Sequence, residues 1–328
     1  MIALLHVRRT AEQTPLTSMI QRVSAPIVLA VAVLLGVVVF GRQFANWGNV
    51  SNMLVTASFL GIIAVGMTVV IIGGGIDLSV GSVFALGAVI AAYSSRWGSF
   101  AGITLPIVVG AAIGLTQGVL IGRARMMPFI VTLAGLLFAR GMAFKVSDNG
   151  NTTHLIDRDR MMIELGQGRF LGIGIPCYVL ALVAVAVAIL LNRTRFGQAT
   201  FAVGGSEEAA QLMGLRVDAI KIGAYALLGG LSGLAGMLVA ARSSSGLSTI
   251  GTGLELEAIA AVVVGGTLLT GGAGGVVGTL TGVMTLTVIQ NFINQVGTLR
   301  SYHQQIVSGL FLTAVVAAQA IIRRREER

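Results

Sequence analysis

Side chains that could carry out chemistry are few in this 328-residue chain and lie far apart. A phosphate-binding Walker A loop needs a lysine directly after a glycine, and neither lysine, Lys145 or Lys221, follows one. The three histidines are scattered, and the single cysteine, Cys177, can form neither an intrachain disulfide nor a multi-cysteine metal site. Paired catalytic carboxylates, a nucleophile elbow and a Rossmann glycine pattern are also missing from the sequence. We therefore predict no enzyme activity, no metal and no cofactor.

One carboxylate has an unusual setting, because Asp77 follows the glycine run 73–75 between two long apolar stretches. A carboxylate in hydrocarbon is costly and by default marks a functional site. The competing interpretation is a helix cap, since Asp77 or Ser79 is suited to the N-cap of a helix that begins near Val80. Both roles can hold together, with the cap directing hydrogen-bond donors toward a pathway.

The elements that hold these residues must cross a membrane. Hydrophobic residues make up 55% of the chain and charged residues 11%, and the mean hydropathy is +0.89. Because a soluble domain carries about 25% charged residues, this composition predicts an integral membrane protein in contact with lipid. The net charge of +9 then reflects basic cytoplasmic loops rather than nucleic-acid binding.

Uncharged stretches long enough to cross a bilayer predict about ten transmembrane helices and an all-α polytopic fold. They are residues 23–41, 53–76, 78–95, 97–122, 126–139, 170–192, 222–241, two spans within 258–299 separated by residues 271–275, and 302–322. The transmembrane domain is predicted as 25–322, between a cytoplasmic N-terminal segment, 1–24, and a cytoplasmic basic tail, 323–328. The distribution of basic residues favours both termini inside, which places loop 193–221 inside and loop 144–170 outside.

The 45 glycines, about twice the usual share, include an internal repeat. A shift of 191 residues places Gly74 and Gly75 on Gly265 and Gly266, and both pairs follow β-branched runs. Duplicated, glycine-interrupted hydrophobic segments point to a transport site formed by broken helices. Close helix packing is the alternative, although packing glycines are usually spaced rather than consecutive. We predict two pseudo-repeated halves with glycine breaks at 73–81 and 265–275.

Five stretches form a specific pattern: FLGIIAVGMT at 59–68 continuing into GGGIDLSVGS at 73–82, PFIVTLAG at 128–135, RTRFG at 193–197, GGSEEAA at 204–210, and LEAIA at 256–260 continuing through GGT at 265–267. This pattern resembles the permeases of bacterial sugar ABC importers of the ribose, xylose and galactofuranose group. The resemblance covers about residues 50–320. Residues 265–269 and 290–291 are similar to one half of the galactofuranose importer's permease pair.

The resemblance implies a passive channel in the bacterial inner membrane that passes a monosaccharide, galactofuranose- or ribose-like, by alternating access. The implied partners are a second permease, a cytoplasmic ATP-binding subunit and a periplasmic sugar-binding protein. The similarity to one half of a two-permease system favours a heterodimer. ATP would be bound by the partner subunit, which agrees with the missing Walker A loop.

Loop 193–221 contains the pattern of a short helix. Ser206 is suited to its N-cap, Glu207 and Glu208 would complement the helix dipole in the first turn, and Gly214 would end it. The resemblance places the ATPase-coupling helix here, and a solvated connector is the alternative. The candidate coupling residues are Ser206, Glu207, Glu208, Ala209, Leu212 and Gly214.

The candidate sugar pathway follows the two glycine breaks. Its predicted residues are Gly74, Gly75, Asp77, Ser79, Phe129, Thr267, Thr270 and Asn291. Sugars need hydrogen-bonding groups and often an aromatic face, which Phe129 could supply. Threonine and asparagine within spans more often hold helices together, and this remains the alternative for those residues.

Two outer features have open roles. Glu255 and Glu257 at the start of the eighth span could cap that helix, which we favour, or contact the binding protein. Loop 144–170 has mixed charges suited to weak, fast docking of the binding protein, with a solvated loop as the alternative.

A stand-alone secondary sugar transporter or facilitator is the alternative function. Such a transporter should carry several intramembrane carboxylates, and only Asp77 qualifies. A structural or receptor-like membrane protein is disfavoured by the glycine breaks. The sequence does not choose the sugar.

Overall fold

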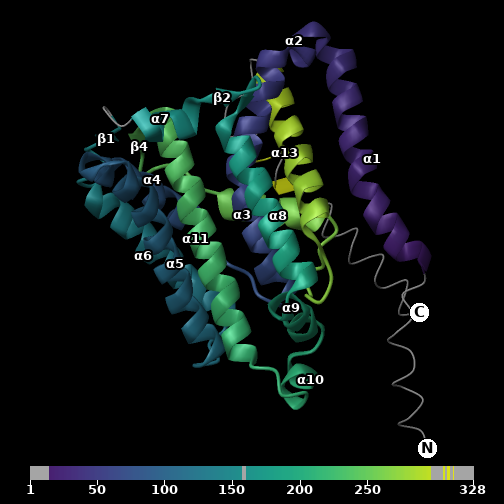
Figure 1. Ribbon diagram of the computed structural model, residues 1–328. Coiled ribbons are helices and arrows are strands. Elements are labelled where there is room, and N and C mark those ends of the chain that lie inside the picture. Colours follow the sequence, from purple (N-terminus) through teal and green to yellow (C-terminus); the bar gives the residue numbers. More distant parts are fainter. Residues whose placement is uncertain (1–14, 157–159, 297–305, 307–308, 311–312, 314–328) are drawn as a thin grey trace, which may run out of the picture.

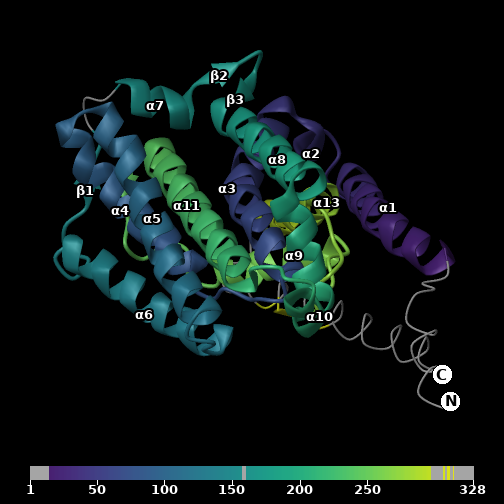
Figure 2. The same ribbon diagram turned by 60° about the horizontal axis from the view of Figure 1, so that its bottom comes forward.

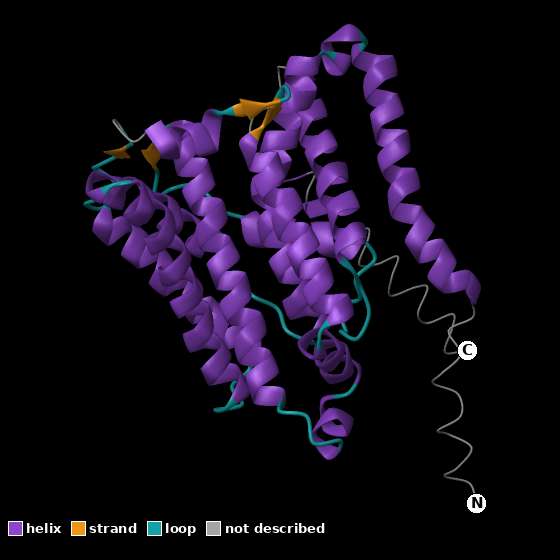
Figure 3. Cartoon of the chain, viewed as in Figure 1, coloured by secondary structure: helices purple, strands orange, loops and turns teal. Residues whose placement is uncertain are grey.

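The computed structural model describes residues 15–156, 160–296, 306, 309–310 and 313, and these residues are almost entirely helical (Figures 1 and 3). The helices are α1 (Pro15–Phe40), α2 (Arg42–Ala45), α3 (Trp47–Ile72), α4 (Val80–Ser94), the 3-10 turn η2 (Ser95–Trp97), α5 (Ser99–Gly122), α6 (Pro128–Val146), α7 (Arg160–Gln167), α8 (Ile175–Arg193), α9 (Arg195–Gly205), α10 (Glu207–Leu212), α11 (Val217–Ser243), α12 (Leu254–Val264) and α13 (Val276–Val296). The described part of the chain also has four two-residue strands, which pair antiparallel: β1 (His154–Leu155) with β4 (Ser245–Gly246), and β2 (Arg169–Phe170) with β3 (Ile173–Gly174).

The predicted spans match this helix order through the described part of the chain. Within the described residues, six helices are long and apolar enough to cross a membrane, namely α3, α5, α6, α8, α11 and α13, and Pro26–Phe40 of α1 is a shorter apolar helix. Helices α4 and α12 are shorter because each adjoins a glycine break, so the predicted broken helices are confirmed. The last predicted span, 302–322, lies almost wholly outside the described residues, as does the tail 323–328.

Two helices extend beyond the uncharged stretches from which the spans were predicted. Helix α1 begins at Pro15, inside the predicted segment 1–24, because a helix can continue past the point where its apolar stretch begins. Helix α6 continues past Arg140, where the span 126–139 was expected to stop. The Arg140 guanidinium donates hydrogen bonds of 2.8 Å to the carbonyl oxygens of Ser248 and Ile250, so its charge is accommodated against protein rather than at a span end.

Helix α3 lies at the centre, surrounded by α8, α11, α12 and α13 (Figures 1 and 2). Its side chains Ile62, Ile63 and Met67 are fully buried, which explains why this segment is apolar on every face. Peripheral helices instead expose large apolar side chains, such as Phe138 on α6 and Leu182 on α8. These outer faces are suited to lipid or to another membrane subunit.

The two polar loops lie at opposite ends of the molecule (Figure 1). Loop 144–170 carries β1, α7 and β2, and loop 193–221 carries α9 and α10. This arrangement agrees with the prediction that the two loops face opposite sides of the membrane. Loop 144–170 is also packed onto the fold, since Met162 is fully buried and β1 pairs with β4.

Glycines spaced by four residues allow α5 and α11 to approach backbone to backbone. A Cβ atom at Gly110 would overlap the Gly229 carbonyl oxygen, and one at Gly114 would overlap the Tyr225 carbonyl oxygen. Gly118 meets the Ile222 Cα in the same way. Close helix packing, the alternative explanation for the high glycine content, therefore applies to these spaced glycines. The consecutive glycines form the breaks instead.

We expect Gly229→Leu to lower stability markedly, because overpacking a close contact costs about 1–3 kcal/mol and here the obstacle is backbone. The matched control is Gly141→Leu on α6, where an added Cβ would meet nothing within 4 Å. Thermal unfolding in detergent, followed by size-exclusion chromatography, measures the difference. Equal midpoints for the two variants would show that this helix contact is unimportant.

Candidate glycine-break site

The first glycine break ends α3 with a Schellman motif. The Gly74 N–H donates to the Ile71 carbonyl oxygen and the Gly75 N–H donates to the Val70 carbonyl oxygen, both at 2.9 Å. Gly74 has φ +79°, a left-handed conformation that glycine adopts without a Cβ penalty. The consecutive glycines therefore satisfy the last carbonyls of α3 while reversing the chain.

The second break repeats this geometry at the end of α12. The Gly266 N–H donates to the Val263 carbonyl oxygen at 3.0 Å, and the Thr267 N–H donates to the Val262 carbonyl oxygen at 3.2 Å. Gly266 has φ +89° and so corresponds to Gly74. The structural offset is thus 192 residues, and the predicted pairing at 191 is wrong by one. Adjacent glycines match almost equally well after a one-residue slip, whereas in the structure the left-handed glycine that ends each helix, Gly74 or Gly266, lies two residues after the last helical residue.

Asp77 organises the turn between the first break and α4. Its Oδ1 accepts hydrogen bonds from both the N–H and the hydroxyl of Ser79, each at 2.7 Å. Helix α4 begins at Val80, as expected, but Ser79 at the N-cap has helical backbone angles and its hydroxyl makes no capping bond. The Ser79 hydroxyl instead accepts from the Gln117 amide at 2.9 Å. The Ser79 side chain therefore does not cap α4, and that part of the prediction is wrong. The Asp77 carboxylate is instead the hydrogen-bond acceptor for the N–H and hydroxyl groups of Ser79.

The two breaks meet the start of the coupling loop at one point, which we call the glycine junction: Gly74, Gly204, Gly271 and Gly272. The Gly272 N–H donates to the Ile72 carbonyl oxygen at 2.9 Å, which joins the second break to the end of α3. A Cβ atom at Gly204 would overlap the same carbonyl oxygen and lie 2.6 Å from the Gly272 nitrogen. A Cβ atom at Gly271 would lie 3.1 Å from the Cα atoms of both Gly204 and Gly74. The C-terminal end of α9 is therefore packed closely against both glycine breaks.

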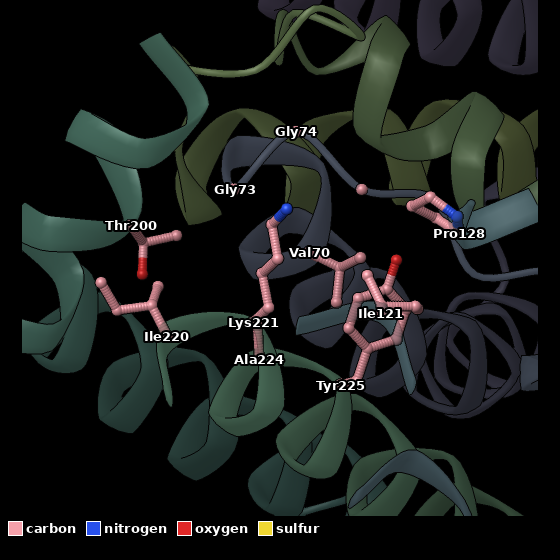
Figure 4. A pocket seen from close by; sticks show the side chains of 11 residues that line it. Val70, Gly73, Gly74, Ile121, Pro128, Thr200, Ile220, Lys221, Ala224 and Tyr225 are labelled. Carbon is pink, nitrogen blue, oxygen red and sulfur yellow. The ribbon is translucent and has the colours of Figure 1, made fainter. Parts of the chain in front are cut away.

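A small cavity, here called the break cavity, lies beside this junction (Figure 4). It is lined by Val70, Gly73, Gly74, Gly75, Ile121, Pro128, Thr200, Ile220, Lys221, Ala224 and Tyr225. Its volume of about 20 Å³ has room for one water molecule, so no sugar fits in this state. The Tyr225 hydroxyl donates to the Ile76 carbonyl oxygen at 3.2 Å and holds the first break against α11.

Lys221 connects the break cavity to the candidate coupling helix. Its side chain lines the cavity, with the amine directed toward the Gly73–Gly74 turn (Figure 4). The same amine lies 2.7 Å from a carboxylate oxygen of Glu207 in α10. The sequence analysis did not predict this ion pair. A signal was present, because Lys221 is one of only two lysines in the chain and directly precedes the predicted span 222–241.

The short helix predicted in loop 193–221 is present as α10. The Ser206 hydroxyl accepts from the Ala209 N–H at 3.3 Å, Glu207 and Glu208 lie in the first turn, and Gly214 follows with φ +80°. Leu212 is 90% exposed at the free end of this helix. An exposed leucine on a short, capped helix at one end of the molecule is suited to a protein interface.

The remaining candidate pathway residues are dispersed. Phe129 is exposed on the first turn of α6, Thr270 is exposed, and Thr267 is buried against Gly274. Asn291 exchanges hydrogen bonds with Asn49 of α3, the shorter at 2.8 Å, which is the helix-joining role left open as the alternative. The structure thus brings Gly74 close to the second break and places Gly75 at the break cavity. Neither Phe129 nor Asn291 lines that cavity.

Comparison with known proteins agrees with this architecture. Residues 49–316 match the family described as branched-chain amino acid transport system / permease component. The chain belongs to this permease family.

Curated relatives cover most of the permease. It is 40% identical to the ribose import permease protein RbsC of Escherichia coli K12 over 88% of this chain and 91% of that protein. It is 41% identical to the inner membrane ABC transporter permease protein YjfF of the same strain, over 84% and 85% of the two chains. It is 38% identical to the L-arabinose ABC transporter permease protein AraH of Azospirillum brasilense, over 87% and 84%. No solved structure matches significantly.

The permease is therefore a multi-pass inner-membrane transport component rather than an enzyme. The resemblance inferred from the sequence motifs is confirmed by these relatives. The family description names amino acids, whereas two of these relatives are named for ribose and arabinose.

Proposed function

We propose that this chain is the membrane-spanning subunit of an ATP-driven importer for a monosaccharide. The names of the curated relatives support sugar import. The observation that carries the mechanism is the glycine junction, where α9, directly before the coupling helix, packs against both broken helices. A displacement of α10 by an ATPase would reach the breaks through rigid backbone contacts and through the Lys221–Glu207 ion pair.

The partners follow from the two ends of the molecule. A cytoplasmic ATP-binding subunit would bind α10 and supply the ATP hydrolysis for which this chain has no Walker A loop. A periplasmic sugar-binding protein would dock at the opposite end, over loop 144–170. A second permease would complete the channel, and we propose a heterodimer. Both termini would then lie in the cytoplasm, with the domain spanning 25–322.

The identity of the transported monosaccharide stays a prediction. The relatives named above include ribose and arabinose permeases, and a fructose import permease protein of Bifidobacterium longum is 31% identical over 93% of this chain. The galactofuranose prediction rests on residues 265–269 and 290–291 alone.

Purification of the tagged permease from its native membrane tests this function. Mass spectrometry of the complex should identify an ATP-binding subunit, a second and different permease, and a bound or binding-protein-held pentose or hexose. A complex with two copies of this chain would contradict the proposed heterodimer but not the proposed function. A complex without any ATP-binding subunit would contradict the proposed function.

A further inference from the structure

A second cavity, here called the glutamate cavity, lies between the two pairs of broken helices. Its walls come from α3 and α4, which flank the first break, and from α12 and α13, which flank the second. Its polar and aromatic lining includes Thr56, Phe59, Phe84, Glu257, Thr287 and Gln290. Its volume of about 230 Å³ greatly exceeds that of the break cavity and is of the order that a single sugar ring occupies.

The lining has the chemistry of a sugar site. Glu257 offers carboxylate oxygens to hydroxyl groups, and the Gln290 side chain lies within hydrogen-bonding reach of that carboxylate. Phe59 and Phe84 add aromatic surface from the opposite pair of helices. A few polar groups that converge among aromatic side chains are what a small polar ligand requires.

Glu257 has a polar partner, Gln290, but no cationic partner among the described residues. The N-cap residue of α12 is Gly253, and Glu255 and Glu257 lie in the first turn, where negative charge complements the helix dipole; their capping of this helix stays a prediction. Among the described residues, no lysine or arginine forms a salt bridge with Glu257. A partly buried carboxylate beside a cavity, without a cation, retains acceptor capacity for a ligand.

The position also suits a transport chamber. Thr56 and Phe59 lie in the first half of α3, whereas the glycine junction lies at the end of that helix near α9 and α10 (Figure 1). The cavity is thus on the side of the junction away from the coupling helix. Substrate sites at the interface between repeats, beside discontinuous helices, are a recurrent transporter arrangement.

We propose that the glutamate cavity is the chamber that holds one monosaccharide during transport, with Glu257 and Gln290 binding its hydroxyl groups and Phe59 and Phe84 contacting its ring. This inference rests on the proposed function. The glycine junction closes the chamber toward α10 in this conformation, and few strong contacts allow release once the junction opens.

Glu257→Gln and Gln290→Leu test the chamber in proteoliposomes with the complete transporter and its sugar-binding protein. The probes are radiolabelled ribose, arabinose, fructose and galactofuranose. We expect each substitution to reduce sugar uptake per ATP hydrolysed about tenfold or more, because a charge-assisted or buried hydrogen bond is lost. The matched control is Glu255→Gln, two residues earlier on α12, which removes a carboxylate that interacts with Arg140 but changes no side chain of the cavity lining. Its uptake should stay within about twofold of the unmodified complex, because a partly exposed charge pair contributes little.

A labelling experiment keeps the proposal testable if those variants fail to assemble. In a Cys177→Ser background, Thr252→Cys places a thiol in the cavity lining, and Thr249→Cys places one on the same loop outside it. A bulky maleimide should block uptake by Thr252→Cys relative to the same variant before labelling, and should leave Thr249→Cys unaffected. Transported sugar should slow the reaction at Thr252→Cys.

Failure of the proposed function and failure of the chamber give different results in these experiments. If the unmodified complex takes up none of the sugars with ATP, the proposed function fails. If it takes up sugar while Glu257→Gln and Gln290→Leu behave like Glu255→Gln, the chamber is refuted and the function stands. Unimpeded uptake after labelling of Thr252→Cys would refute the chamber independently.

Discussion

Replacing Gly204 by alanine should nearly abolish transport, although it adds only one methyl group. The new Cβ atom would overlap the Ile72 carbonyl oxygen and crowd the Gly272 nitrogen, which are backbone atoms that cannot rotate away. The hydrogen bond between Gly272 and Ile72 would have to break or α9 would have to move off both breaks. We expect ATP-driven uptake to fall at least about tenfold, since strain of about 1–3 kcal/mol falls on the moving contact.

Gly205→Ala is the matched control for this experiment. Gly205 is the next residue of α9, and an added Cβ would meet nothing within 4 Å. Its uptake should stay within about twofold of the unmodified transporter, since a free Cβ adds no overpacking strain. Both variants are compared in vesicles at equal amounts of assembled complex. Similar uptake by the two variants would mean that the glycine junction is not part of the transport mechanism.

The second large effect is expected at the coupling helix. Glu208→Lys combined with Leu212→Asp should abolish sugar-stimulated ATPase activity while the permease remains folded. Both side chains are exposed on α10, so the substitutions disturb no core packing. They place a cation in the first turn, where the helix dipole opposes it, and replace the exposed apolar side chain by a charge.

The control pair is Glu208→Gln with Leu212→Met, which keeps size and apolar character. It should retain most of the stimulation. The readout is the ratio of ATPase rates with and without the loaded binding protein in reconstituted vesicles. Full stimulation of the charge-altering pair would place the ATPase contact elsewhere, and loss in both pairs would indicate a general sensitivity of α10 rather than a docking surface.

Local sequence signals predicted the helices and the positions of the breaks well. Uncharged stretches gave the spans because hydrocarbon excludes charge, and consecutive glycines marked the ends of α3 and α12 because a Schellman motif needs a left-handed residue. Ser206 was recognisable as the cap of α10 for the same local reason.

Contacts between distant segments were not predictable in this way. Arg140 should have ended a span, but carbonyls of Ser248 and Ile250, more than a hundred residues away, accommodate its charge. Gly204 looked like part of a loop, and its role depends on Ile72 and Gly272 meeting it in space. By contrast, the spacing of Gly110, Gly114 and Gly118 by four residues is a sequence pattern typical of a close contact between two helices.

We propose that this permease moves a monosaccharide at the expense of ATP hydrolysed by a partner subunit. The most direct measurement is uptake of labelled ribose, arabinose, fructose and galactofuranose into vesicles that contain the complete complex, with and without ATP inside the compartment that α10 faces. We predict accumulation of one of these sugars only when ATP, the ATP-binding subunit and the sugar-binding protein are all present. Accumulation without ATP, driven by a proton or sodium gradient, would rule out an ATP-driven importer and show a secondary transporter instead.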